Sequence, residues 1–357
     1  MHAAVNLPNT PLPVTLLTGF LGSGKTTLIN ALLRNHPDER IAIIENEFGS
    51  VGIDGGLIHS QADVEVIELS NGCVCCSIRG ELSAALQNIL AKIDRGELNI
   101  QRLILETTGL ADPGPIIQTF FVDEIIRERI RLDAVITLVD AHHITRHLDE
   151  HRVAAAQIGF ADRMILTKTD LIPVDEKDSI LQRIQSINAK AEIFEAINGT
   201  LPKASWLDIA AFDLDESSPI NANSFSPSMG RYAPATAPTL SSEQLFNTFT
   251  PVVSQQSWDD EIQSYVFEAG AMDLGKLDVF MEDLVAQYGN DMLRYKGVLA
   301  IAHEERPLII QGVHKVVGFD YGNPSAQPQR SLMIVIGRHL PYETLREQFL
   351  QAQTNSA

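Results

Sequence analysis

The stretch Gly19-Phe20-Leu21-Gly22-Ser23-Gly24-Lys25-Thr26-Thr27 follows the apolar run Val14–Leu17, and apolar residues of helical spacing follow it over Leu28–Leu33. In a loop of the form G-x-x-x-x-G-K-[ST], backbone N–H groups surround a polyphosphate, and glycines are needed because a Cβ would block this close approach. The positive end of the following helix points at the same anion. The stretch therefore predicts a strand, a phosphate-binding loop and a helix, and with them a site for a nucleoside triphosphate.

Within this loop the residue types suggest separate roles. Lys25 is expected to reach the β- and γ-phosphates as a point charge, and the Thr26 hydroxyl is the usual ligand of the Mg²⁺ that bridges them. Thr27 is expected to support the phosphates from one residue further along. An ordinary glycine-rich turn with a surface lysine is the alternative, which the flanking strand and helix disfavour. The predicted nucleotide contacts here are Gly22, Ser23, Gly24, Lys25, Thr26 and Thr27.

The composition describes a globular protein. The chain has 357 residues, of which 45% are hydrophobic and 20% charged, so it is long enough for two domains. Its formal net charge of −19 argues against nucleic acid as a partner, because an acidic surface repels a phosphate backbone. No run approaches the roughly 18 apolar residues that span a bilayer, and Met1–Pro13 lacks the pattern of a signal peptide. We therefore expect a cytoplasmic protein with no membrane contact.

The first part of the chain alternates strands with helices. Such alternation specifies a doubly wound, mainly parallel sheet with helices on both faces, an α/β fold of the P-loop type. Polar motifs follow the strands, at the edge where ligands of these sheets collect. A single helix is expected over Ile116–Ile130. The expected strands after the phosphate loop are Ile41–Glu45, Val64–Leu69, Leu103–Leu105, Val135–Val139 and Arg163–Leu166.

Further along, the composition changes. Ser, Pro, Asn and Ala dominate between Asp213 and Gln256, which indicates an extended linker. We therefore divide the chain into a P-loop domain over 1–212, a linker over 213–256 and a smaller α+β domain over 257–357. Few strands of the last region are joined by helices, which predicts a largely antiparallel sheet. Its expected strands are Glu261–Phe267, Val298–Ala302, Leu308–Val317 and Leu332–Ile336, and its expected helices are Leu274–Tyr288 and Tyr342–Leu350.

The element Thr167-Lys168-Thr169-Asp170 ends a predicted strand well after the phosphate loop, where guanine-specific P-loop proteins carry N/T-K-x-D. A carboxylate there accepts hydrogen bonds from guanine N1–H and the 2-amino group, and adenine offers neither. Asp170 is expected to do this while the stem of Lys168 packs on the base. A polar loop after a strand is the alternative. The order of the two motifs favours guanine, although Thr167 in place of Asn leaves open how firmly the base loop is held.

Glu106 ends the apolar strand Leu103–Leu105 and is the expected acidic partner of Mg²⁺, directly or through water. Gly109 lies where a backbone N–H can sense the γ-phosphate, and the region of Gly114 and Pro115 is a candidate switch loop. The alternative for Glu106 is a strand-end acid that caps the next turn. The expected catalytic residues are thus Lys25, Thr26 and Glu106.

The three cysteines of the chain, Cys73, Cys75 and Cys76, lie within four positions at a predicted corner between strand and helix. Thiolates hold Zn²⁺ in tetrahedral sites and also suit Co²⁺ and Cu⁺. Three cysteines leave at least one ligand to be found, unless two chains share a metal. A redox pair or buried thiols that pack as small apolar residues are alternatives. Strand-end candidates for a further ligand are Glu45, Glu47, His143 and His142.

Together these motifs resemble the CobW-type family of P-loop GTPases, close to its YjiA branch. The C-x-C-C element distinguishes this family among P-loop proteins. Arg294-Tyr295-Lys296-Gly297 and Gln311-Gly312-Val313 resemble the family's C-terminal domain. The five motifs of the first 200 residues occur in the family's order: Gly19–Thr27, Glu45-Asn46-Glu47-Phe48-Gly49, Gly72–Cys76, Glu106–Pro113 and Thr167–Asp170.

The resemblance implies a GTPase that binds zinc, or a similar divalent metal such as Co²⁺, and delivers it to a client metalloprotein. By position, Cys73, Cys75 and Cys76 become zinc ligands, and Glu45 and His143 match metal-binding positions of the YjiA branch. Two departures, Ser50 and Asn198, stand where that branch can carry Glu and His. The chain also lacks the His-rich tract with which some relatives load metal.

On this basis we expect GTP and Mg²⁺ to order the segments after Glu45 and Glu106, and hydrolysis to GDP to switch the affinity for metal or client. A zinc sensor or buffer with incidental GTPase activity, or a cobalt-handling relative, is the alternative within the family. An ATP-dependent small-molecule kinase is a third hypothesis, which the acidic surface and Asp170 disfavour. The client, the physiological metal and whether the chain forms a homo-oligomer stay open.

Overall fold

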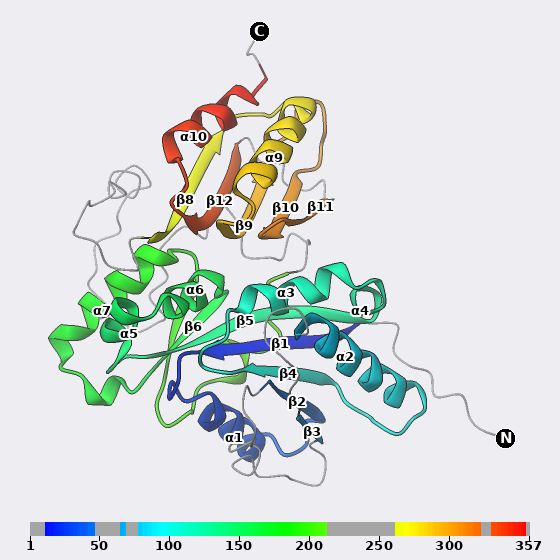
Figure 1. Cartoon of the computed structure of the whole chain (residues 1–357), viewed down its shortest axis with the longest axis vertical. Coiled ribbons are helices and arrows are strands. Elements are labelled where there is room, and N and C mark those ends of the chain that lie inside the picture. Colours follow the sequence, from blue (N-terminus) through cyan, green and yellow to red (C-terminus); the bar gives the residue numbers. More distant parts are fainter. Residues whose placement is uncertain (1–10, 47–64, 69–77, 213–260, 323–329, 355–357) are drawn as a thin grey trace.

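The computed structural model describes residues 11–46, 65–68, 78–212, 261–322 and 330–354. These residues form two sheets, one in each half of the chain (Figure 1). The predicted linker over 213–256, the three cysteines, Glu47 and Ser50 lie outside the described residues. Among the described residues, no helix has both the length and the apolar composition needed to cross a bilayer.

The first sheet has seven strands in the order β3-β2-β4-β1-β5-β6-β7, and its paired strands run parallel. The strands are β1 (Leu12–Gly19), β2 (Ile41–Asn46), β3 (Glu65–Glu68), β4 (Arg102–Thr107), β5 (Ile130–Asp140), β6 (Arg163–Thr167) and β7 (Glu192–Ala196). The helices are α1 (Lys25–Asn35), α2 (Ile78–Asp94), α3 (Pro113–Val122), α4 (Glu124–Arg129), α5 (Ile144–Glu150), α6 (Arg152–Phe160) and α7 (Val174–Ile187).

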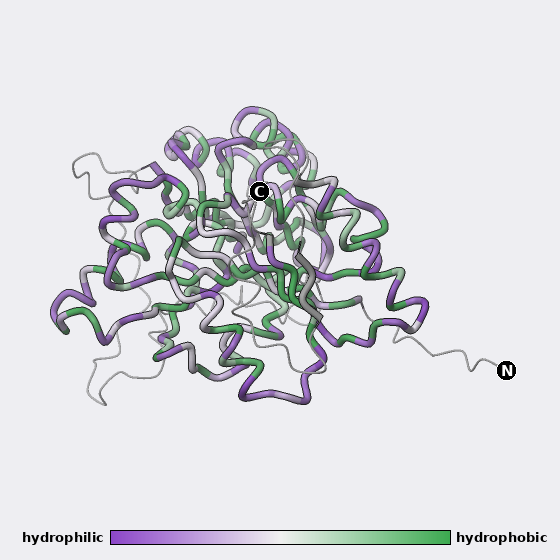
Figure 2. The backbone as a smooth tube through the Cα atoms, turned by 60° about the horizontal axis from the view of Figure 1, so that its bottom comes forward, coloured by the Kyte–Doolittle hydropathy of each residue, from purple (hydrophilic) through white to green (hydrophobic). Residues whose placement is uncertain are grey.

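Burial on both faces explains the apolar runs of these strands. β1 lies in the middle of the sheet, and its residues Val14, Leu16 and Leu17 are completely buried. A strand covered by helices on both sides needs apolar side chains at successive positions instead of at every second one. Figure 2 shows the hydrophobic segments gathered inside the molecule and the hydrophilic ones on its outer turns.

The second sheet has five antiparallel strands in the order β11-β10-β9-β12-β8. Side chains of its two helices, such as Phe280 and Phe349, form a separate core with one face of the sheet. The other face lies toward the first domain, where α6 contacts β8, β9 and β12 (Figure 1). The elements are β8 (Ile262–Ala269), α9 (Leu274–Tyr288), β9 (Met292–Leu299), β10 (Leu308–Val313), β11 (Val316–Tyr321), β12 (Ser331–Arg338) and α10 (Tyr342–Gln351).

The predicted fold class is confirmed, but three predicted elements are wrong in their extent. The helix expected over Ile116–Ile130 is two helices, α3 and α4, because the backbone of Asp123 is extended there and its carboxylate accepts a hydrogen bond from Ile126 N, the cap of α4. The remaining residue, Ile130, starts β5.

The other two errors concern the second sheet. The strand expected over Leu308–Val317 is a hairpin, β10 and β11, whose turn contains His314 with a positive φ of 51°. The strand expected over Val298–Ala302 is β9, which begins six residues earlier at Met292. Its charged residues Arg294 and Lys296 face the first domain, so they interrupt the apolar pattern that marks a covered strand.

Candidate functional site

The phosphate loop joins β1 to α1 through glycines that no other residue replaces without strain. Gly19, Gly22 and Gly24 have φ values of 139°, 71° and 100°. A Cβ on Gly19 would lie 2.4 Å from the carbonyl oxygen of Leu138. The loop therefore takes its shape from positive φ angles and close backbone approach, as a polyphosphate cradle requires.

Two side chains of the loop face inward. The Lys25 Nζ donates hydrogen bonds to the carbonyl oxygens of Gly19 at 2.9 Å and Phe20 at 3.4 Å, and Lys25 is only 8% exposed. The Ser23 Oγ is buried and has no hydrogen-bond partner among the described residues. A buried hydroxyl without a partner is rare, and a phosphate oxygen in the loop would supply one.

The start of α1 and the end of β4 bring a hydroxyl and a carboxylate together. The Thr26 Oγ1 lies 3.5 Å from the Glu106 Oε1, although 80 positions separate the two residues in the chain. The register of the parallel strands, in which Leu17 lies beside Glu106, produces this contact. Two hard oxygen ligands at the mouth of the phosphate loop fit Mg²⁺.

Gly109 follows Glu106 and packs on the loop from the other side. A Cβ at Gly109 would lie 2.4 Å from Leu21 N, so only glycine allows this approach. The backbone of the segment after β4 thus lies against the phosphate loop, at the place expected for a γ-phosphate sensor.

The predicted base element is tied to the phosphate loop. Thr167 ends β6, and its Oγ1 lies 2.9 Å from the carbonyl oxygen of Ser23 and 3.3 Å from that of Val139. The hydroxyl of Thr167 thereby anchors the element, which answers the question raised by Thr in place of Asn. Asp170 is exposed, within a 3₁₀ turn over Thr169–Leu171.

Asp140, at the end of β5, contacts a lysine and a histidine. Its Oδ2 lies 2.7 Å from Lys168 Nζ and 2.9 Å from His143 Nδ1. Burial raises the pKa of Asp140, but the hydrogen bonds and charges of Lys168 and His143 outweigh burial and hold that pKa below its usual value. Asp140 therefore carries a negative charge and fixes the position of Lys168.

The sequence reasoning missed one element of this edge, the turn over residues 197–200. Asn198 and Gly199 both have positive φ, and Thr200 N donates to the carbonyl of Ile197 at 2.9 Å. A Cβ on Gly199 would lie 2.8 Å from Thr27 O, so the turn packs on the start of α1. It follows β7, which pairs with β6, and therefore lies beside the base element. The Asn-Gly pair is a strong turn signal and marks it in the sequence.

The predicted metal ligands are not all brought together. Glu45 is buried in β2, beside Glu106 of β4 in register. His143 follows β5, and three strand spacings, about 14 Å, separate β2 from β5. Glu45 and His143 therefore stand at strands that are not neighbours in the sheet. Among the described residues, no group of three or more His, Cys, Asp or Glu is arranged to hold a metal.

Four histidines form a ring cluster with Phe20 of the phosphate loop; the sequence predicted His142 and His143 as candidate ligands but did not single out His147 and His151. The ring of Phe20 packs on His147 with 4.2 Å between centroids and on His151 with 4.8 Å. His143 stacks on His147 at 5.8 Å, and its other neighbour is His142. Burial lowers the pKa of His147, so its ring packs here as a neutral group.

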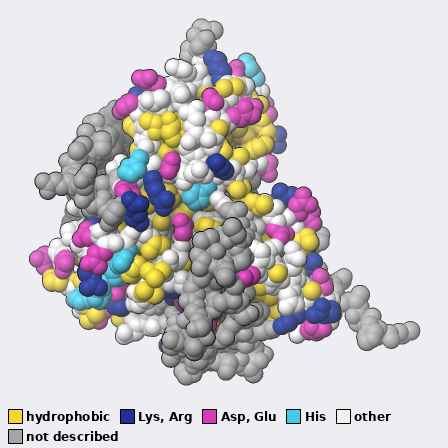
Figure 3. Space-filling view, viewed as in Figure 1, with side chains coloured by type: hydrophobic (Ala, Val, Ile, Leu, Met, Phe, Trp, Pro, Cys, Tyr) yellow, Lys and Arg dark blue, Asp and Glu magenta, His cyan; other side chains and the backbone are white. Residues whose placement is uncertain are grey.

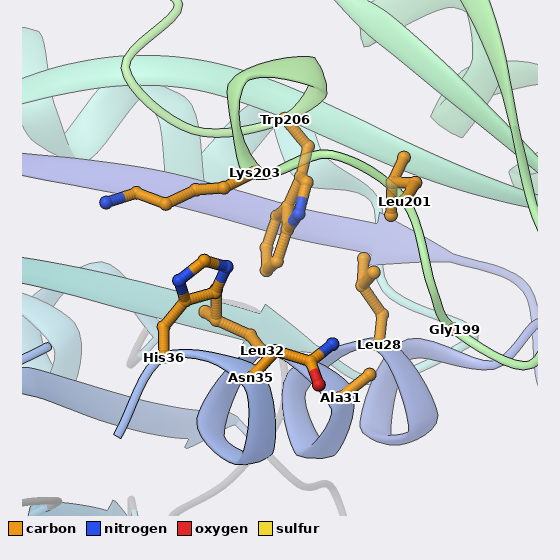
Figure 4. A pocket seen from close by; sticks show the side chains of 9 residues that line it. All are labelled: Leu28, Ala31, Leu32, Asn35, His36, Gly199, Leu201, Lys203 and Trp206. Atoms are coloured by element: carbon orange, nitrogen blue, oxygen red, sulfur yellow. The ribbon is translucent and has the colours of Figure 1, made fainter. Parts of the chain in front are cut away.

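A small hollow lies between α1 and the segment over residues 199–206 (Figure 4). Trp206 points from that segment toward the helix, and both apolar and polar side chains line the hollow. The polar groups of the phosphate loop do not line it, so it is not the nucleotide site. Its lining residues are Leu28, Ala31, Leu32, Asn35, His36, Gly199, Leu201, Lys203 and Trp206.

The surface visible in Figure 3 carries no continuous basic area among the described residues. Lys and Arg side chains alternate there with Asp and Glu. This distribution agrees with the net charge of −19 and gives no support for nucleic-acid binding.

The comparisons with known proteins agree on one family. The sequence model of the CobW/HypB/UreG nucleotide-binding domain matches residues 13–195, and that of the cobalamin synthesis protein cobW C-terminal domain matches residues 262–353. The chain is 38% identical over 341 residues to the zinc chaperone YjiA of Escherichia coli (strain K12), covering 95% of this chain and 98% of that protein.

Two further comparisons extend this result. Over 215 residues the chain is 38% identical to the zinc-regulated GTPase metalloprotein activator 1 of Schizosaccharomyces pombe, covering 58% of this chain and 51% of that protein. The crystal structure of Zn(II)-bound YjiA GTPase from E. coli superimposes with a TM-score of 0.72 at 33% sequence identity, covering 97% of this chain and all of that one.

Proposed function

Because the chain belongs to the CobW family of P-loop GTPases, we propose that it hydrolyses GTP and uses this reaction to deliver zinc to a client metalloprotein. The family resemblance expected from the sequence is thereby confirmed. One observation carries the GTPase part of the proposal. The phosphate loop, the Thr26–Glu106 pair and the base element form a single edge, and the contact between Thr167 and Ser23 joins the last to the first.

The residues of this edge have separate roles in nucleotide binding and hydrolysis. Lys25 supplies positive charge where negative charge develops on the transferred phosphoryl group, and the N–H groups of Gly22–Thr27 hold the phosphate oxygens. Thr26 and Glu106 would hold Mg²⁺, which neutralises charge on the phosphates when it is bound. Asp170 selects guanine, and Asp140 keeps Lys168 in place beside it.

Zinc is the cargo in this proposal, and the thiolates of Cys73, Cys75 and Cys76 are its ligands. β3 ends at Glu68, which lies beside Glu45 of β2 in register, and Glu45 in turn lies beside Glu106. The chain therefore enters the cysteine segment from the same edge that carries the Mg²⁺ ligands. Glu45 of β2 and His143, which follows β5, are the two additional ligands in this proposal.

The test compares zinc affinity between nucleotide states. The purified chain is loaded with GDP or with a non-hydrolysable GTP analogue, and Zn²⁺ binding is measured by competition with a chromophoric chelator, in parallel with Co²⁺. We expect the affinity to change at least about tenfold between the states, which requires only about 1.4 kcal/mol of coupling.

Two controls accompany this measurement. Cys75→Ala should abolish tight zinc binding and leave GTP binding intact, and His303→Ala, an exposed histidine of the second domain, should change neither. Equal zinc affinity in both nucleotide states would reject the coupling and favour a zinc buffer. A preference for ATP that survives Asp170→Ala would reject the GTPase.

A further inference from the structure

Three parts of the molecule enclose the segment Gly109–Gly114, which follows the Mg²⁺ ligand Glu106. The phosphate loop packs on its start through Leu21. Helix α6 contacts its middle, and a hairpin of the C-terminal domain contacts its end. The segment is therefore held from both domains at once, immediately after the residue expected to respond to the nucleotide.

Helix α6 fixes the middle of the segment through Gln157. The Nε2 of this side chain, which is 1% exposed, donates to the carbonyl oxygens of Gly109 at 3.2 Å and Ala111 at 3.1 Å. Two residues further, α6 meets the second domain, where a Cβ on Gly159 would lie 2.9 Å from Leu293 Cδ2. A displacement of the segment thus acts on a helix that is packed against the C-terminal sheet.

The C-terminal hairpin contacts the end of the segment through His314. A Cβ on Gly114 would lie 2.6 Å from His314 Nε2 and 3.0 Å from Phe160 Cζ, so a larger residue there would displace the ring. Asp112 caps α3 by accepting from Gly114 N at 2.9 Å, which fixes the backbone beneath the imidazole. His314 therefore seats on the first turn of α3.

The two sequence motifs of the C-terminal domain keep this hairpin in place. The Arg294 side chain donates to Phe160 O at 3.0 Å and forms a buried ion pair with Asp162. Gln311 donates to Phe212 O at 2.6 Å, which joins β10 to the end of the first domain.

Tyr295 completes the support. Its ring occupies the space that a Cβ on Gly312 would fill, and its hydroxyl donates to Val316 O at 3.1 Å, directly after the turn. Arg294-Tyr295-Lys296-Gly297 and Gln311-Gly312-Val313 thus support the hairpin and the interface on which it depends.

We propose that His314 is a positioning residue for GTP hydrolysis, which sets the segment Gly109–Gly114 and couples the nucleotide state to the placement of the C-terminal domain. The proposal rests on the GTPase function proposed above. A γ-phosphate that draws Gly109 toward the phosphate loop moves the first turn of α3, against which His314 packs. Because coupling between two sites is reciprocal, the position of the hairpin in turn influences the conformation of Gly109–Gly114 and the rate of GTP hydrolysis.

The first test removes the ring without straining the backbone. Glycine tolerates the positive φ of position 314, so His314→Gly deletes the contact while keeping the turn. We expect kcat for GTP to fall about five- to tenfold with KM changed less than twofold, the size of a modest coupling between sites. His303→Gly is the matched control, because His303 has a positive φ of 65° in the same domain and is exposed.

The second test asks whether the effects of two substitutions on kcat are independent of each other. Gly114→Ala introduces a methyl group that pushes against His314, and kcat should fall. In the double variant Gly114→Ala/His314→Gly, kcat should be close to that of His314→Gly alone, because the ring that the methyl group meets at 2.6 Å is gone and only Phe160 Cζ, at 3.0 Å, remains in contact with it. If the fold-reduction of kcat in the double variant equals the product of the two single reductions, Gly114 and His314 act independently, and the proposal is overturned.

Hydrogen exchange of the wild-type chain gives a readout that a purely structural role would not move. Peptides covering residues 313–316 should exchange at different rates with GDP and with a non-hydrolysable GTP analogue. Equal rates, or a His314→Gly enzyme with wild-type kcat, overturn the inference while the GTPase function stands. A wild-type chain that neither binds nor hydrolyses GTP overturns both.

Discussion

The nucleotide edge and the domain interface of this molecule are built in opposite ways. The edge consists of loops whose shape depends on positive φ at Gly19, Gly22 and Gly24, and it contains a buried hydroxyl, Ser23 Oγ, that has no partner among the described residues. At the interface, a strand residue, Arg294, meets a buried partner, Asp162, and a carbonyl. The edge needs a ligand to complete its hydrogen bonds, whereas the interface completes its own.

This contrast predicts where a substitution acts. Changes at the interface should lower folding stability first, because they leave a buried group without its partner. Changes at the edge should lower binding or turnover and spare the fold, because the ligand is the missing partner there. The following predictions test this division, beginning with the largest expected effect.

Arg294→Met should destabilise the protein most. It removes the closer of two cations from the buried Asp162 and leaves only Lys296 Nζ, 3.8 Å from Asp162 Oδ1. Breaking a buried pair from one side costs about 3–5 kcal/mol, and the remaining contact with Lys296 places the expected loss at the lower end, about 3 kcal/mol. Urea denaturation followed by fluorescence measures the change. Arg306→Met, which breaks a pair with Glu304 at the surface, should cost less than about 1 kcal/mol. An equal loss of stability in Arg294→Met and Arg306→Met would show that the buried interface pair contributes no more than a surface pair.

Lys25→Ala should reduce GTP hydrolysis by about 10²–10³-fold, because the phosphoryl group loses its charge partner in a water-poor loop. A phosphate-release assay measures this, and urea denaturation should show a much smaller change than in Arg294→Met. Lys177→Ala, in the surface pair with Glu195, is the control and should hydrolyse GTP at the wild-type rate. If Lys25→Ala hydrolyses GTP at nearly the wild-type rate, the reaction does not take place at the phosphate loop.

Asp170→Asn should weaken GTP binding by about 1.5–3 kcal/mol, the value of a hydrogen bond to a charged group. Competition between labelled GTP and unlabelled GTP or ATP measures the discrimination, which should fall by about 10–100-fold with the fold unchanged. Asp175→Asn, an exposed carboxylate in the first turn of α7, is the control. Unchanged discrimination in Asp170→Asn would mean that another group selects the base.

The smallest expected effect concerns pH at the interface. Burial lowers the pKa of His314 below 6.5, although Asp112 opposes this shift. Protonation therefore favours the unfolded chain, and the folded state loses stability as the pH falls from about 6.5 toward the lowered value. Arg338 faces the same ring and disfavours its charge. The variant His314→Asn should lose less stability than the wild type as the pH falls through this window. Urea denaturation at several pH values measures this, and identical pH profiles for the two proteins would contradict a lowered pKa of His314.

Six strands of the first sheet were predicted from the sequence, whereas its edge strand β7 and part of the second sheet were not. β7 is only partly buried, so its residues do not form a continuous apolar run. Burial on both faces produces continuous apolar runs, as in Ile41–Ile44, which indicate a strand without reference to its partners. In β9, the alternating side chains of Arg294 and Lys296 face the first domain. Arg294 is covered there because Phe160 O accepts its hydrogen bond and Asp162 forms an ion pair with it. Lys296 donates to the carbonyl oxygen of Ala211 in the same interface. No local pattern reveals such partners. The turn at Asn198 and Gly199 is a different case, since its Asn-Gly signal was present in the sequence.

The sequence by itself determined the phosphate loop, the base element and the fold class, because each depends on neighbouring residues: glycines at fixed spacing, a Lys-x-Asp after an apolar run, and strands alternating with helices. Only the tertiary structure decided which strand ends meet. The strand order β2-β4-β1-β5 differs from the chain order, so Thr26 meets Glu106 and Glu45 lies beside it, while His143 lies beyond β1. Hydrogen-bonded pairing between distant segments sets that order, and spacing along the chain carries no record of it.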